Sequence, residues 1–193
     1  MSVFIQPGEI LSPSAYKTKR ELINRQVIEF ERKRRITTRT FSFLFEHKDI
    51  ILNQITEMVF LENVTDYKEV QHLIGIYEDL MPSNGVLSVS MFIEISDQDQ
   101  LLREMPKLAG IEKTVFLVFD SAEIQATPES GRSTEVLEST LQYLKFKFSR
   151  AQVSRFTRSK NAFIETRKKE YEQVARIPPD LLETLKKEIV SVE

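Results

Sequence analysis

Residues 87–95, which read Leu-Ser-Val-Ser-Met-Phe-Ile-Glu-Ile, decide the fold of this chain. Apolar side chains stand at every second position and alternate with Ser88, Ser90 and Glu94. Because successive side chains of a strand point to opposite faces of its sheet, this pattern predicts a strand with one buried face and one mostly polar face. The fold must therefore contain a sheet, and the rest of the chain has to supply its other strands.

Further stretches with strand patterns lie on both sides of this one. The almost continuously apolar run at 114–119 predicts a central strand covered on both faces, and a turn at 120–121 joins it to 123–126. The remaining predicted strands are the aromatic stretch 41–45, the amphipathic stretch 143–148, and a last hairpin of 162–166 with 171–177.

Helical periodicity marks the segments between these strands. Tyr16, Ile23, Val27 and Phe30 recur at steps of seven, four and three, which predicts a long N-terminal helix from Ser12 to Arg35. A central pair of helices is also predicted: the first starts at Asp49 and has an apolar stripe that reaches Val59, and the second follows 63–66 and ends at 81–85. The other predicted helices are a short one from 97 to 108 before Gly110, one that opens with a capping box at 149–152, and a closing helix at 181–190.

The order of these elements indicates the fold class. Helices and strands follow one another in mixed runs rather than in regular βαβ alternation. We therefore predict an α+β fold, with a largely antiparallel sheet, a long N-terminal helix, a central helix pair and a C-terminal helix. Residues 1–193 are predicted to form a single α+β domain. The polar stretch 127–139, which contains Pro128 and Gly131, is predicted to be a mobile loop.

The charges of the chain are sorted by position. Residues 1–40 carry nine Lys and Arg against four Asp and Glu, residues 41–140 carry six against eighteen, and residues 141–193 carry twelve against seven. The net charge of −2 thus hides two basic ends, each of +5, around an acidic middle of −12. Because opposite blocks attract, this arrangement favours ion pairs within the chain and docking between chains.

The composition excludes several kinds of site. The chain has no cysteine, which removes disulfides, thiolate metal sites and Cys nucleophiles. Its five glycines form no phosphate-binding loop, and no G-x-S-x-G element is present. We predict no cofactor. There is no leader pattern and no run of about eighteen apolar residues, so we expect a cytoplasmic protein without a membrane-spanning segment.

The basic run Arg32-Lys33-Arg34-Arg35, with Arg39 just beyond it, could neutralise phosphates. It stands alone, however, in a chain with a slightly negative net charge and no helix-turn-helix pattern. The run also lies at the C-terminal end of a predicted helix, where cations stabilise the helix dipole. We therefore do not expect nucleic-acid binding, and we expect these side chains to form ion pairs with the acidic middle.

A metal site is the minority hypothesis. Glu69 and His72 have the E-x-x-H spacing that, used twice with two further carboxylates, builds di-iron sites in helical bundles. Here the motif occurs once. If Ile74 lies at the centre of the apolar stripe, Glu69 and His72 point away from the core and into solvent. Glu46, at the end of a predicted strand, could complete a surface site with them.

Several apolar residues favour an interaction role instead. Ile50, Leu61, Ile76 and Phe92 each lie off the main stripe of their own element. Another part of the fold or a partner chain must therefore cover them. Together with the opposite charge blocks, this predicts a protein partner or a homo-oligomer.

The chain also resembles an uncharacterised bacterial family, domain of unknown function 3501. The residues that carry the resemblance are the basic run 32–36, Phe45-Glu46, Lys48-Asp49, Gln54, Glu57-Met58, Gln71-His72, Tyr77, Leu80, Pro82, Leu87-Ser88, Phe92-Ile93-Glu94-Ile95 and Gly110-Ile111-Glu112. His47 departs from the pattern, because a small polar residue is expected there.

The resemblance implies no activity, but it suggests a class of partner proteins and a set of candidate functional residues. Members are encoded, in several bacteria, near rubrerythrin-like and iron–sulfur oxidoreductase proteins, which implies redox or oxidative-stress partners. The polar positions of the shared pattern are the candidate functional residues, namely Arg35, Glu46, Gln54, Glu57, His72, Tyr77 and Glu94.

Two functions follow as hypotheses. The first is a non-enzymatic, cytoplasmic protein-interaction or accessory factor with a redox partner. The alternative is a metal-assisted or carboxylate-based enzyme that uses Glu46, Glu57, His72 and Tyr77 on an unknown substrate.

Overall fold

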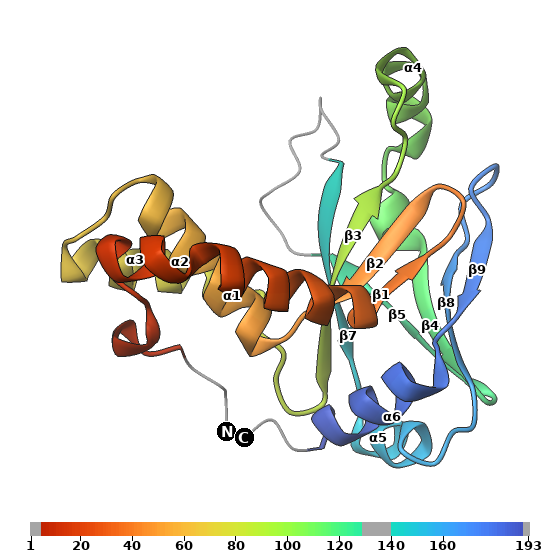
Figure 1. Ribbon diagram of the computed structural model, residues 1–193. Helices are drawn as coiled ribbons and strands as arrows, with labels where there is room; N and C mark the ends of the chain where they lie inside the picture. Colours follow the sequence, from red (N-terminus) through yellow and green to blue (C-terminus); the bar gives the residue numbers. More distant parts are fainter. Residues whose placement is uncertain (1–4, 129–139, 191–193) are drawn as a thin grey trace.

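The computed structural model describes residues 5–128 and 140–190, and it has the predicted α+β fold (Figure 1). Two antiparallel sheets lie beside a group of helices. The five-stranded sheet has the order β1 (Arg35–Thr37), β2 (Phe41–Phe45), β3 (Val86–Ile93), β7 (Leu141–Lys147) and β6 (Thr127–Pro128). The four-stranded sheet has the order β5 (Ala122–Gln125), β4 (Val115–Phe119), β8 (Ala162–Thr166) and β9 (Gln173–Arg176).

The helices begin where the sequence places capping residues. Side chains of Ser12, Asp66, Asp97 and Ser149 accept hydrogen bonds from backbone N–H groups of the first turns of α1, α3, α4 and α5. The helices are η1 (Pro7–Glu9), α1 (Pro13–Arg34), α2 (Lys48–Leu61), α3 (Tyr67–Glu78), α4 (Gln98–Leu108), η2 (Ile111–Thr114), α5 (Arg150–Phe156) and α6 (Pro179–Glu188). None of these described helices combines the length and apolar character needed to cross a bilayer.

Most of the alternating stretch 87–95 forms β3, which lies between β2 and β7 in the five-stranded sheet. Its apolar face enters a core shared with the inner face of the four-stranded sheet and with α6. The main members of this core from β3, β4 and α6 are Leu87, Val89, Met91, Leu117, Phe119, Leu182 and Leu185. The predicted alternation is confirmed, because each of these side chains lies on the inward face of its element.

The polar face of β3 is buried as well. Ser88 and Ser90 are almost inaccessible, and Ser42 on the neighbouring strand is fully buried. The C-terminal part of α1 packs against β2 on this side (Figure 1). Buried hydroxyls need hydrogen-bond partners, so this face holds a row of polar contacts rather than bulk water.

The helices α1, α2 and α3, coloured from red to gold in Figure 1, extend away from the sheets. A second apolar core fills this helical arm, formed by Ile51, Ile55 and Val59 of α2 with Leu80 and Met81. The stripe of α3 packs against it through Val70, Leu73, Ile74 and Tyr77. The two central helices therefore pack their apolar stripes on each other.

One strand prediction is wrong in part. β4 is central in its sheet, as expected, but only its inner face is fully covered. Phe116 and Val118 point outward and are half-buried, with the Arg167 guanidinium 4.1 Å from the centroid of the Phe116 ring. A continuous apolar run therefore does not require two covered faces here, because long neighbouring side chains shield the outer one.

The predicted mobile loop at 127–139 has only two described residues at its start. Thr127 and Pro128 form β6, which pairs with β7, and residues 129–139 lie outside the described part.

The apolar residues that lie off the main stripes of their elements divide into two groups. Ile50 is buried and Phe92 lies beneath the Arg35 guanidinium, whereas Leu61 is 65% and Ile76 is 42% exposed.

Candidate functional site

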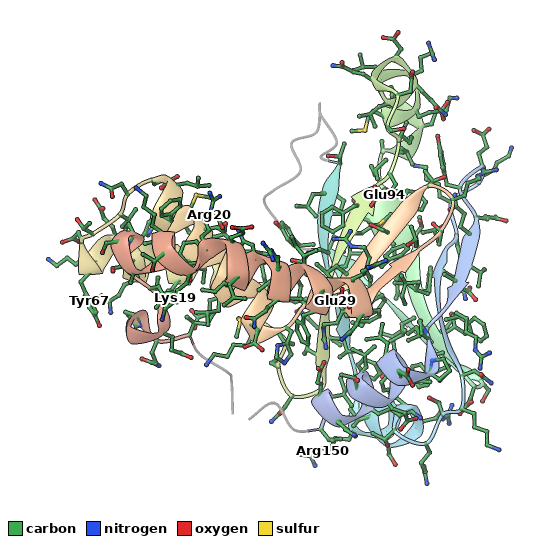
Figure 2. The ribbon with its side chains drawn as sticks, viewed as in Figure 1. Lys19, Arg20, Glu29, Tyr67, Glu94 and Arg150 are labelled. Atoms are coloured by element: carbon green, nitrogen blue, oxygen red, sulfur yellow. The ribbon has the colours of Figure 1, made fainter. Side chains whose placement is uncertain are left out.

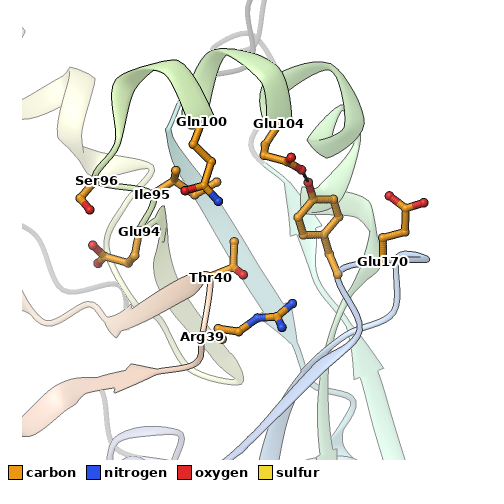
Figure 3. A pocket seen from close by; sticks show the side chains of 9 residues that line it. Arg39, Thr40, Glu94, Ile95, Ser96, Gln100, Glu104 and Glu170 are labelled. Carbon is orange, nitrogen blue, oxygen red and sulfur yellow. Dashed lines mark hydrogen bonds between the residues drawn. The ribbon is translucent and has the colours of Figure 1, made fainter.

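An open groove lies at one end of the two sheets (Figure 3). Its volume is about 490 Å³. We call it the acidic groove, and it is lined by Arg39, Thr40, Glu94, Ile95, Ser96, Gln100, Glu104, Glu170 and Tyr171. Three of these side chains are carboxylates and one is a guanidinium, so the lining has a net negative charge, which Arg35 beside Glu94 and Lys107 beside Glu104 partly offset.

Four separate segments build the groove. Arg39 and Thr40 lie in the turn between β1 and β2, and Glu94 directly follows β3. Figure 3 shows Gln100 and Glu104 reaching down from α4. The fourth wall is the turn between β8 and β9, which contains Glu170 and Tyr171. No single stretch of sequence therefore contains the site.

Hydrogen bonds hold the walls of the groove together. The Gln173 side chain accepts from the Thr40 backbone N–H at 3.0 Å and donates to the Thr40 hydroxyl at 2.7 Å. The Tyr171 hydroxyl donates to the Glu104 carboxylate. That bond, with Lys107 nearby, lowers the pKa of Glu104, whereas burial and the neighbouring Glu104 raise the pKa of Tyr171 to about 12. Glu104 is therefore ionised at neutral pH.

Glu94 links the groove to the buried polar face of the sheet. Arg35 Nη1 donates to Ser42 Oγ at 2.8 Å, and Ser42 donates in turn to Glu94 Oε1. The same Arg35 atom lies 3.8 Å from Glu94, and its guanidinium stacks 4.5 Å from the Phe92 ring centroid. Two of the predicted residues, Arg35 and Glu94, are thus brought together through a serine that the sequence did not single out.

Glu46 is buried further along the same sheet face. Its Oε1 accepts a hydrogen bond from Ser90, and its Oε2 has no partner among the described residues. Burial raises the pKa of Glu46 to about 7, helped by Glu31 and opposed by Ser90, Arg34 and Arg35. Glu46 is one of the residues that line a cavity of about 10 Å³, which is just large enough for one water molecule. Glu46 is therefore a protonatable group in the interior.

Glu57 forms a separate cluster between α1 and α2. Its carboxylate accepts hydrogen bonds from the Tyr16 hydroxyl at 2.7 Å, from Asn24 at 2.6 Å, and from two nitrogens of Arg20 at 2.9 Å each. These bonds, chiefly the one from Arg20, lower the pKa of Glu57 to about 2. Figure 2 shows Arg20 in the helical arm, in a different part of the molecule from Glu94. This cluster fastens α1 to α2.

Substituting Glu57 with glutamine should destabilise the protein at neutral pH by about 2 kcal/mol. The amide is uncharged and has only one oxygen, so it cannot accept both hydrogen bonds from the Arg20 guanidinium. The pKa of Glu57 is lowered in the folded state, so its contribution is present above about pH 4.5 and is lost as the pH falls toward 2. Urea denaturation at pH 7 and pH 3 measures both effects. Glu62→Gln, at the exposed end of the same helix, should change stability by less than about 0.5 kcal/mol at either pH. A Glu57→Gln variant as stable as the wild type at pH 7 would contradict the role of this cluster.

The remaining predicted residues lie on α2 and α3. Glu69 and His72 are exposed, as the position of the apolar stripe predicted. Tyr77 packs on the core of the arm, and Gln54 is half-buried on α2. Glu46 is buried on the sheet face, whereas His72 lies at the surface of the arm. Among residues 5–128 and 140–190, no group of three or more His, Asp or Glu side chains is placed to hold a metal ion.

His47, the position that departs from the family pattern, caps α2. Its Nδ1 accepts the backbone N–H of Asp49 at 3.2 Å, and its ring meets the Phe30 ring edge-on at 5.1 Å. Burial and the nearby Arg34 lower the pKa of His47. A small polar side chain could make the same capping bond.

Most residues of the groove were missed by sequence reasoning. Arg39, Gln100, Glu104, Glu170 and Tyr171 follow no local spacing rule, because the fold brings them together from distant segments. One signal was present in the chain: Glu170 directly follows the basic Arg167-Lys168-Lys169 turn of the last predicted hairpin. Its φ of 73° puts it in the left-handed region, where non-glycine residues are uncommon.

Comparison with known proteins supports the resemblance. A crystal structure of a novel protein of unknown function from Burkholderia pseudomallei K96243 is similar over 98% of this chain and 100% of its own, with 26% identity and a TM-score of 0.90. A search of curated proteins finds no match. The family model for the protein of unknown function DUF3501 matches residues 4–189. The chain therefore belongs to the DUF3501 family.

Proposed function

We propose that this protein is a non-enzymatic binding protein whose acidic groove holds a basic segment of a protein partner. The observation that supports this most is the set of three carboxylates, from Glu94, Glu104 and Glu170, around an open hollow with one guanidinium, from Arg39. Charged groups arranged in this way attract a partner of opposite sign and orient it. A Lys or Arg side chain entering the groove would meet the carboxylates and the amide of Gln100.

The openness of the groove favours a protein over a small molecule. Pockets for small ligands are usually enclosed and mostly apolar, with a few polar groups that fix orientation. Here the lining is mostly polar, and Figure 3 shows it open between α4 and the two turns. Weak, transient protein contacts use charged surfaces of this kind.

Two further features support the groove as a binding site. Glu170 holds a left-handed backbone conformation that costs about 1 kcal/mol, and such strain is often kept at functional positions. Glu104 is oriented by the Tyr171 hydroxyl before any partner arrives. A preorganised carboxylate loses less freedom on binding than a mobile one.

The family resemblance selects the first partners to test. Redox proteins that exchange electrons meet through small, charge-complementary contacts. We therefore propose an iron–sulfur or rubrerythrin-like protein with a basic surface as the partner of the groove.

The proposal is tested with a peptide of alternating Lys and Gly, with a Glu-Gly peptide as the negative control. We expect the basic peptide to bind at about 50 mM salt and to weaken at about 500 mM, because exposed charges are screened. The triple variant Glu94→Gln, Glu104→Gln, Glu170→Gln should lose at least about tenfold in affinity. Fluorescence anisotropy measures both.

A matched variant controls for net charge. Glu21→Gln, Glu62→Gln, Glu69→Gln removes three exposed carboxylates from the helical arm and should bind the basic peptide within about twofold of the wild type. If both triple variants lose equal affinity, or if the groove variant binds unchanged, the groove is not the binding site.

A second candidate function is a carboxylate-based enzyme, and Glu46 is the observation that favours it. A buried acid with a pKa near 7 suits general acid–base chemistry. The metal-assisted form is tested by elemental analysis of protein purified without an affinity tag. Stoichiometric iron, manganese or zinc would support it; no bound metal, with an unchanged melting temperature on adding metal, would remove it.

A further inference from the structure

The outer face of the four-stranded sheet has a regular arrangement of side chains. Across the order β5-β4-β8-β9, the cross-strand partners form two rows that point outward. The first row is Glu123, Val118, Phe163 and Arg176, and the second is Gln125, Phe116, Glu165 and Val174. The residues between them on the strands, among them Leu117, Ile124 and Ile164, are buried in the core.

This face is only partly covered. Phe116, Val118 and Phe163 are half-buried, although they lie in the two central strands of the sheet, and Val174 is 62% exposed. A patch that joins two aromatic rings and two valines is larger than the isolated apolar residues normal at protein surfaces. The face therefore has the character of an interface.

The first row is complementary to itself. An acid stands on one edge strand, two apolar residues stand in the centre, and a base stands on the other edge strand. A rotation of 180° about an axis parallel to the strands puts β5 opposite β9 and keeps each row at its own height. It places Glu123 opposite the partner's Arg176, and Val118 opposite the partner's Phe163.

We propose that two copies of this chain pack the outer faces of their four-stranded sheets against each other about this axis. The charges select the axis. A two-fold axis in the interface but perpendicular to the strands would put β5 opposite β5 and leave Glu123 without a basic partner in the other copy. Aligned packing of two sheets face to face is a common arrangement, with side chains of both faces interdigitating.

Each charged residue of the row has a surface partner within its own chain, which it would exchange for a contact across the interface. Glu123 pairs with Arg167 at 2.8 Å, and Arg176 donates to Asn161, but both contacts are at the surface. Exposed pairs of this kind contribute little to stability, so exchanging them for contacts across an interface loses little. Arg167 also neutralises Glu165 at 2.9 Å, which lets that acid approach an apolar face.

The size of the face predicts a weak dimer. Four strands about 4.8 Å apart, each four or five residues long, cover a footprint of roughly 15 Å by 15 Å. A footprint of about 225 Å² on each copy is well below the roughly 800 Å² per partner of a standard interface, so we expect a transient dimer with a dissociation constant of about 100 µM or above.

Sedimentation velocity of the full chain, from about 1 µM to about 1 mM, tests the proposal. The wild type should pass from monomer to dimer over this range. Phe163→Glu should weaken the dimer at least tenfold, because it buries a charge at the centre of the face. Leu102→Glu, at an apolar residue on α4 that is 63% exposed, is the control outside the face and should dimerise as the wild type does.

A charge exchange tests the axis. Glu123→Arg and Arg176→Glu should each weaken the dimer about threefold to tenfold, and the double variant should regain wild-type affinity. A wild type that stays monomeric at about 1 mM would overturn the proposal, as would a dimer that tolerates Phe163→Glu or a double variant that is not restored. Circular dichroism of each variant shows whether a loss comes from misfolding; if Phe163→Glu does not fold, Val174→Glu at the exposed edge replaces it. None of these results bears on the acidic groove, which lies elsewhere.

Discussion

Replacing Arg34 with methionine should lower the free energy of unfolding by about 3–5 kcal/mol. Arg34 is buried, and its guanidinium donates to the backbone oxygens of Phe45 and Glu46 at 2.8 and 3.1 Å. It also makes a bidentate ion pair with Glu188, in which Nη1 and Nη2 donate to the two carboxylate oxygens at 2.7 and 2.8 Å. Arg34 thus joins the end of α1 to the end of β2 and to α6. Methionine keeps the apolar, unbranched stem of the side chain but leaves these acceptors without a donor.

The matched control for Arg34 is its neighbour Lys33. The Lys33 side chain is 73% exposed, and its nearest carboxylate oxygen is 3.9 Å away on Glu29. Lys33→Met removes one cation from the same helix end and should change stability by no more than about 0.5 kcal/mol. Urea denaturation at pH 7 measures both variants. If Arg34→Met were within about 1 kcal/mol of the wild type, the junction between the helical arm and the sheets would not depend on this side chain.

Replacing Glu46 with glutamine should make the protein more stable than the wild type at pH 8. The pKa of Glu46 is raised to about 7 by burial, so the folded state keeps the proton over a range where the unfolded chain has released it. The wild type therefore loses stability as the pH rises from about 4.5 to about 7. Each pH unit corresponds to about 1.4 kcal/mol, which gives a total of roughly 3 kcal/mol. Glutamine has no proton to lose, and its oxygen can still accept the Ser90 hydrogen bond.

The Glu46 experiment compares the two proteins at several pH values. At pH 4.5 we expect the wild type and Glu46→Gln to have similar stabilities, and at pH 8 we expect the variant to be the more stable by up to about 3 kcal/mol. Glu69→Gln on the surface of α3 shows the general effect of losing one negative charge. A difference between wild type and Glu46→Gln that does not change with pH would show that Glu46 is already ionised in the fold.

Local patterns in the sequence predicted the elements well. Alternation at 87–95 identified β3, and the capping residues Asp97 and Ser149 marked the starts of two helices. These signals work because a strand or a helix is decided largely by neighbours in the chain. The α+β fold followed from the order of the elements.

Contacts between distant segments could not be predicted in this way. Arg34 and Glu188 are 154 residues apart, and both belong to the basic ends of the chain. The burial of Ser42, Ser88 and Glu46 on the polar sheet face also depends on the helical arm covering it. Nothing in the alternation of β3 distinguishes a polar face under a helix from one in water.

The basic run 32–35 contains residues whose positions the sequence predicted and one, Arg34, whose position it did not. Arg32 and Lys33 are exposed at the end of α1, where the helix dipole accounts for them as predicted. Arg35 pairs with Glu94 of the acidic middle, as expected, but Arg32 and Lys33 lie 3.9 Å from Glu29 of their own helix, and Arg34 pairs with Glu188 of the other basic end. Arg34 is buried instead, because the turn of the helix directs every third or fourth side chain inward.

The central claim is that the acidic groove receives a basic segment, and an NMR titration of the full chain tests it most directly. A Lys-Gly peptide is added to labelled protein, and the backbone amide shifts are followed residue by residue. We expect the largest changes at Glu94, Ser96, Gln100, Glu104 and Glu170, with those changes reversed by added salt. The largest changes at the exposed face of α3, around Glu69 and His72, or uniform small changes over the whole acidic middle, would contradict the claim.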